Sequence, residues 1–130
     1  MALTLLDPEH NRFLMKFSAV DRKMVVDHLR TVLNSFAMKP QYTKFYIGIT
    51  GDLEGRLLRH QRHKPEFKLM VPIYEEPAHY LDDSFDLLER TAIAAFRAGI
   101  HNPTTKELLL KCDNGAEGAA PKSYLYILVG

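Results

Sequence analysis

The clearest structural signals in the chain lie in Phe45-Tyr46-Ile47-Gly48-Ile49-Thr50-Gly51-Asp52-Leu53-Glu54-Gly55-Arg56-Leu57-Leu58-Arg59-His60. Its first part, Phe45–Ile49, is rich in β-branched and aromatic residues, which predicts a strand. Thr50–Asp52 then supplies a turn and a carboxylate that can cap the N-terminus of a helix. Helical spacing follows, with Leu53, Leu57 and His60 or Gln61 on one face. The stretch therefore predicts a strand, a turn and an amphipathic helix.

Tyr46, Arg56 and His60 are spaced so that they can meet at one point of the surface. The turn folds the first helical turn back over the end of the strand, which brings Arg56 towards Tyr46. His60 lies one helical turn beyond Arg56 and projects from the same side. The alternative is a purely structural role, with Tyr46 buried in the strand and the basic residues on a solvated helix.

The pattern Tyr46-Ile47-Gly48, then Arg56 after seven residues and His60 after three more, resembles the second half of the GIY-YIG nuclease motif. The resemblance implies that the Tyr, Arg and His are active-site residues. It also implies an α+β fold with a small antiparallel β-sheet of about three strands flanked by α-helices. It covers about Lys44 to Asn102 and leaves an added N-terminal helix, about 18–37, outside it.

Length and composition predict a single domain over residues 1–130. The hydrophobic share of 46% and the charged share of 25% are ordinary for a globular protein. Cys112 is the sole cysteine, so no intramolecular disulfide can form and a reducing, cytoplasmic setting is expected. No apolar run approaches the length of a membrane span, which predicts a soluble protein without membrane partners.

Positive charge is concentrated in one part of the chain, although the net charge is only +1. A basic stretch runs from Arg56 to Lys68, and it predicts salt-sensitive contacts with a few phosphates. The expected partner is DNA, with RNA not excluded. The residues that we expect to bind nucleic acid are Arg59, Arg62, His63, Lys64 and Lys68. A solvated helix end followed by a polar loop is the alternative interpretation.

The remaining elements are expected to surround the Tyr46 strand. A helix is predicted from Ser18 to before Pro40, with Met24 in its apolar, core-facing stripe. In the strand predicted over Lys68–Tyr74, Pro72 favours an edge position or a bulge. The other predictions are a helix capped by Asp82-Asp83-Ser84 that ends at Gly99, a short helix over Thr104–Lys111 and a strand over Ser123–Val129.

Glu89 is the candidate metal ligand. Nucleases of the GIY-YIG type take a carboxylate for a divalent cation from a helix after the third strand, and Leu87–Ile93 resembles that helix. A carboxylate among apolar neighbours is costly to desolvate unless it is paired or bound to a metal. Mg²⁺ or Mn²⁺ is the implied cofactor, since Mg²⁺ often takes only one or two protein oxygens. An ordinary exposed Glu89 is the alternative.

The resemblance also implies a site asparagine after that helix, and two residues fit. Asn102 lies at a suitable distance, while Asn114 precedes a glycine-rich segment similar to one found in some members. We favour Asn102, although both are also ordinary turn residues.

The first tripeptide of the family, Gly-Ile-Tyr, is absent before Tyr46. The C-terminal stretch Ser123–Val129 is similar to the strand that carries it in several members, and Tyr126 occupies the tyrosine's place. We therefore expect a circular permutation, with the last strand antiparallel to the Tyr46 strand. Chain termini often lie close together at a domain surface, so such a transfer is physically permissible. An ordinary core strand is the alternative.

The resemblance as a whole implies a metal-dependent endonuclease that hydrolyses DNA phosphodiester bonds. A water would be activated by Tyr126 or Tyr46 with His60, and Arg56 would stabilise charge on the phosphate. A catalytically inactive nucleic-acid- or protein-binding module of the same fold is the alternative, and an unrelated α+β domain is a third. No added DNA-binding domain is evident, so an oligomer or a protein partner is expected to supply affinity.

Overall fold

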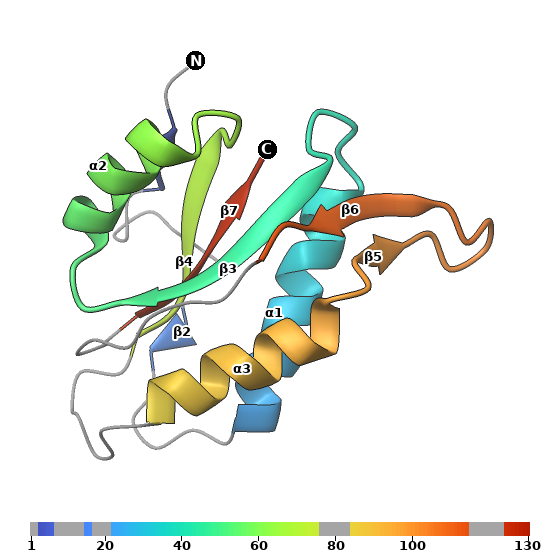
Figure 1. Ribbon diagram of the computed structural model, residues 1–130. Helices are drawn as coiled ribbons and strands as arrows, with labels where there is room; N and C mark the ends of the chain where they lie inside the picture. Colours follow the sequence, from blue (N-terminus) through green and yellow to red (C-terminus); the bar gives the residue numbers. More distant parts are fainter. Residues whose placement is uncertain (1–2, 7–14, 17–21, 76–83, 115–123) are drawn as a thin grey trace.

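The computed structural model describes residues 3–6, 15–16, 22–75, 84–114 and 124–130 (Figure 1). Its three helices are α1 (Arg22–Ala37), α2 (Leu53–His63) and α3 (Ser84–Phe96). Its strands are β1 (Thr4–Leu5), β2 (Met15–Lys16), β3 (Lys44–Thr50), β4 (Leu69–Glu75), β5 (Ile100–His101), β6 (Leu108–Cys112) and β7 (Tyr124–Val129). None of the helices in these ranges has the length and hydropathy needed to cross a membrane.

The strands form a seven-stranded mixed sheet in the order β1-β4-β7-β3-β6-β5, with β2 also paired to β4. Its centre, β4-β7-β3, is antiparallel. Parallel strands extend it on both sides, with β1 and β2 against β4 and β6 against β3. The expected α+β class is therefore right, but the small antiparallel sheet of about three strands is wrong. The added strands β1, β2 and β5 have two residues each, too few for a period to be visible in the sequence.

The segment predicted as a short helix, Thr104–Lys111, is instead a turn followed by β6, so that prediction is wrong. β6 pairs with β3 and with β5. The apolar run Leu108–Leu110 has no period that separates helix from strand, and Lys106 in the preceding turn has a φ of 66°, which no helix allows. The conformation of β6 is therefore set by its pairing, with β5 at Leu108 and Leu110 and with β3 at Lys111 and Cys112.

β7 lies in the middle of the sheet, between β3 and β4 (Figure 1). It is antiparallel to β3, with Gly48 opposite Tyr126 and Ile47 opposite Ile127. The predicted pairing of the C-terminal strand with the Tyr46 strand is thus confirmed, while Ser123 lies outside the described residues. The chain's last strand completes the central layer of the fold.

Side chains alternate between two faces of the central strands. Phe45, Ile47 and Ile49 pack into one core with buried residues of α1 and α3. Tyr46 and Tyr126 point to the other face and pack with Leu53 of α2. The helices are therefore divided, with α2 on one face and α1 and α3 on the opposite face, as Figure 1 shows.

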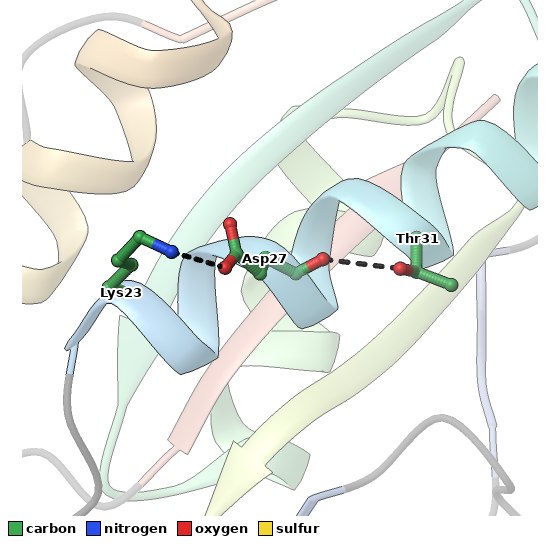
Figure 2. A network of polar contacts seen from close by, with 3 residues as sticks. All are labelled: Lys23, Asp27 and Thr31. Atoms are coloured by element: carbon green, nitrogen blue, oxygen red, sulfur yellow. Dashed lines mark hydrogen bonds and ion pairs between the residues drawn. The ribbon is translucent and has the colours of Figure 1, made fainter.

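Helix α1 covers its face with a stripe that includes Leu29, which is fully buried. Its outer surface is polar, and Figure 2 shows Lys23 paired with Asp27 at 3.2 Å and the Thr31 hydroxyl donating to the Asp27 carbonyl at 3.2 Å. Met24 is 57% exposed, so its prediction as a core residue is wrong. It lies one position before the buried stripe. The predicted helix end before Pro40 is confirmed, and residues 18–21 lie outside the described residues.

Local signals at both ends of helices and within one strand are confirmed. Asp52 caps α2, with its carboxylate accepting from the Gly55 amide at 3.1 Å. Gly99 follows α3 with a φ of 84°, a conformation that favours glycine, and its amide donates to the Phe96 carbonyl. In β4 the register shifts between Pro72 and Tyr74, which is the predicted bulge, although β4 has partners on both sides. The predicted cap at Asp82 and Asp83 lies outside the described residues.

The central position of β7 predicts a large loss of stability for Ile127→Ala. Ile127 is fully buried, so removing its side chain should lower the free energy of unfolding by about 2–5 kcal/mol. Leu108→Ala is the matched control, since Leu108 is 49% exposed and should lose less than about 1 kcal/mol. Urea denaturation measures both. Equal losses would contradict the central placement of β7.

Candidate active site

Tyr46 of β3, His60 of α2 and Tyr126 of β7 meet on the α2 face of the sheet, and we call them the Tyr–His cluster. His60 Nε2 lies 2.7 Å from the Tyr126 hydroxyl oxygen, a hydrogen-bond distance. The ring centroid of Tyr46 lies 5.4 Å from that of His60 and 6.5 Å from that of Tyr126. The structure thus brings together three of the predicted site residues from distant parts of the chain.

Gly48 makes room for the ring of Tyr126. A Cβ atom at this position would overlap the Cζ and Oη atoms of Tyr126, which pairs with Gly48 across the β3–β7 ladder. Any larger residue would push the Tyr126 hydroxyl away from His60. The close approach of the Tyr126 ring therefore explains why position 48 is a glycine. This reason becomes visible only when β7 is placed beside β3.

His60 is held neutral. Burial lowers its pKa from 6.5 to about 4, and nearby basic side chains add to the shift. The contributing side chains are Arg56, Lys64, Arg59 and His63. Because the folded protein resists protonation of His60, this group stabilises the fold above about pH 6.5, and the contribution, about 3 kcal/mol, is lost as the pH falls towards 4. At neutral pH one ring nitrogen of His60 can accept a proton.

Cations surround the cluster. The Lys64 ammonium lies 4.6 Å from the Tyr46 ring centroid, a cation–π contact, and Lys64 is half-buried. Arg56 is also half-buried and is the basic residue that most lowers the pKa of His60. Positive charge at partly buried positions suits a site for an anion such as a phosphate. From the sequence, Lys64 was predicted only as part of the basic stretch. Its spacing of four residues from His60 is the signal that could have placed it beside the cluster.

The five residues predicted to bind nucleic acid divide into separate groups. Arg59, Arg62 and His63 are exposed and line, with Leu58, a surface hollow of about 430 Å³ on the outside of α2. Lys64 points to Tyr46 instead. Lys68 lies elsewhere, with its ammonium donating to the Gln41 carbonyl at 2.7 Å.

Glu89 belongs to α3, on the other side of the sheet from Arg56 and His60. Ala92 and Ile93 of the same helix are buried in the core of that opposite face. The Glu89 side chain lies outside the described part of the structure, so its predicted meeting with Arg56 and His60 stays a prediction. Among the described residues, no three His, Cys, Asp or Glu side chains gather to hold a metal ion.

The two candidate asparagines have structural partners. The Asn102 side chain accepts from the amides of Thr104 and Thr105 and so closes the turn between β5 and β6. The Asn114 side chain accepts from the Ile47 amide at 2.8 Å and donates to the Ile47 carbonyl at 2.6 Å. Asn114 therefore continues the parallel pairing to β3 beside Tyr46 and Gly48. Of the two, Asn114 is the one in contact with the strand that carries the cluster.

Comparison of the chain with protein-family models, curated proteins and solved structures gave no match. The resemblance to the GIY-YIG nucleases therefore depends on the residues themselves.

The contact between Gly48 and Tyr126 predicts that Gly48→Ala is destabilising. The added methyl group overlaps a buried ring, so the free energy of unfolding should fall by about 1–3 kcal/mol. Tyr126→Leu removes the overlapping atoms. The double variant Gly48→Ala/Tyr126→Leu should therefore lose less than the sum of the two single losses in urea denaturation. Strictly additive losses would show that the two residues do not touch.

Proposed function

We propose that this protein is an endonuclease that hydrolyses DNA phosphodiester bonds at the Tyr–His cluster. The observation that carries the proposal is the 2.7 Å contact between the Tyr126 hydroxyl and His60 Nε2. The resemblance assigns catalytic roles to Tyr46, Arg56 and His60, and a tyrosine from the C-terminal strand replaces the missing one. Three of these four residues lie together in the cluster, while Arg56 is close enough to influence the pKa of His60.

The pair suggests how a water is activated. Tyr126 donates its hydroxyl proton to the neutral His60 Nε2 and takes a proton from the attacking water. The water oxygen then bonds to phosphorus, the bond to the leaving oxygen breaks, and solvent protonates that oxygen. His60 finally returns its proton to solvent. Transfer of the tyrosine proton is unfavourable in the free protein, since a tyrosine pKa is near 10 and that of His60 is about 4. A bound phosphate anion would offset the nearby cations and raise the pKa of His60.

Arg56 is the residue proposed to hold the scissile phosphate. Its guanidinium stays charged and offers several donors to phosphate oxygens, so it can stabilise charge that develops in the transition state. It lies one helical turn before His60 on α2. The phosphate would thus be held beside the pair that activates the water.

Mg²⁺ or Mn²⁺ remains part of the proposal on the strength of the resemblance, which assigns it to Glu89. Among the described residues no three His, Cys, Asp or Glu side chains lie together beside the cluster, and α3 lies across the sheet. A bound cation would supply Lewis acidity and charge neutralisation at the phosphate. The roles given to Tyr126, His60 and Arg56 do not depend on it.

A second function is favoured by burial, namely a non-catalytic nucleic-acid- or protein-binding module. Tyr46, His60 and Tyr126 are only 2%, 4% and 1% exposed. Catalysis therefore requires that side chains over the cluster move when DNA binds, and Lys64 is one that can do so. In a binding module the cluster would only hold α2 against the sheet.

Removal of one hydroxyl separates the two functions. We expect the wild-type protein to nick plasmid DNA with Mg²⁺ or Mn²⁺ and Tyr126→Phe to be slower by a factor of about 10² or more. Tyr124→Phe is the matched control on the same strand, where the hydroxyl lies 3.4 Å from Glu75, and it should stay within about twofold. Circular dichroism checks that all proteins are folded. If the folded wild-type protein cleaves neither duplex, branched nor single-stranded DNA, the endonuclease proposal is wrong and the binding module is the function that stands.

A further inference from the structure

The outer side of α2 carries positive charge that the proposed reaction does not use. Arg59, Arg62 and His63 are exposed there and line the hollow of about 430 Å³ together with Leu58, which is 66% exposed. We call these four residues the outer face of α2. No carboxylate among the described residues forms an ion pair with the three basic side chains. The charge of Arg59 and Arg62 is therefore available to a ligand.

Helical geometry separates the outer face from the Tyr–His cluster. His60 is buried on the inner side of α2, while Arg59 and Arg62 come one residue before it and two after it. At 3.6 residues per turn these positions point well away from His60, about 100° and 160° around the axis. A phosphate held by Arg59 and Arg62 is thus not the phosphate that meets Tyr126.

We infer that the outer face of α2 is a second phosphate site, which anchors the backbone of DNA away from the reacting bond. Two arginines three residues apart lie on neighbouring positions of the helix surface and can both engage phosphate oxygens through their planar forks of donors. His63, four residues after Arg59, extends the row by about 6 Å along the helix. The hollow admits a charged group between these side chains.

The choice of DNA over an acidic polypeptide depends on the proposed function. His60 of the cluster and the outer face belong to the same eleven-residue helix, so one nucleic-acid strand or duplex can pass from the cluster to the outer face. A chain with a net charge of only +1 has little long-range attraction for DNA. Its affinity for DNA would therefore come from local contacts with phosphates, such as those of an anchoring site. Binding can be measured without cleavage, so the inference can fail separately from the proposed reaction.

The test is the salt dependence of DNA binding by Arg59→Gln/Arg62→Gln. Fluorescence anisotropy with a labelled short DNA duplex, in EDTA so that metal-dependent cleavage is prevented, gives Kd between about 50 and 200 mM salt. Losing two phosphate contacts should reduce the slope of log K against log salt by about 2, and Kd at low salt should rise roughly tenfold. A plasmid-nicking assay on the same variant reports the reaction itself.

The control removes the same charge from the opposite face. Lys23→Gln/Arg97→Gln changes two exposed residues, one on α1 and one just after α3, and should alter Kd by less than about twofold with the slope unchanged. The inference is overturned if both double variants bind alike, or if the wild-type protein does not bind DNA. It is also overturned if polyglutamate binds as tightly as DNA and its binding is lost when the same arginines are replaced. Tighter binding of RNA of the same sequence would overturn it as well.

Discussion

The hydrogen bond between His60 and Tyr126 is the contact on which the arrangement of this fold depends. It joins α2 to a strand 66 residues later in the chain, in a place that water does not reach. Loss of this buried hydrogen bond would cost about 0.5–1.5 kcal/mol. The bond forms only because Gly48 leaves space for the tyrosine ring. This contact thus joins three parts of the chain: β3 around Tyr46, helix α2 and the distant strand β7.

The two faces of the sheet carry different side chains. One face of β3 and β7 carries apolar side chains that pack with α1 and α3, and the other carries Tyr46 and Tyr126 under α2. Arg56 and the outer basic residues belong to the α2 side, whereas Glu89 belongs to a helix of the other side. A carboxylate ligand from α3 would have to reach around the sheet, so the chemistry proposed for this protein depends first on the tyrosine, the histidine and the arginine.

The sequence was informative where the signal was local or dense in apolar residues. Asp52 could be recognised as a cap, and the aromatic C-terminal strand could be paired with β3 because a strand was missing there. Strands of two residues carry no period, and pairing alone fixes β1, β2 and β5. Met24 was misassigned because the buried stripe of α1 begins one position later. The face on which Glu89 lies could not be predicted, since it depends on how α3 crosses the sheet.

The protonation state of His60 shows whether this side chain is buried against Tyr126. Nuclear magnetic resonance of the ¹⁵N-labelled imidazole groups can follow it against pH, with His60→Gln identifying its signals among those of six histidines. We expect a neutral ring at pH 7 that titrates with a pKa of about 4, because burial and nearby cations disfavour its charged form. Titration near the ordinary value of 6.5 would show that His60 is exposed to water and not bonded to Tyr126, and would rule out the buried pair.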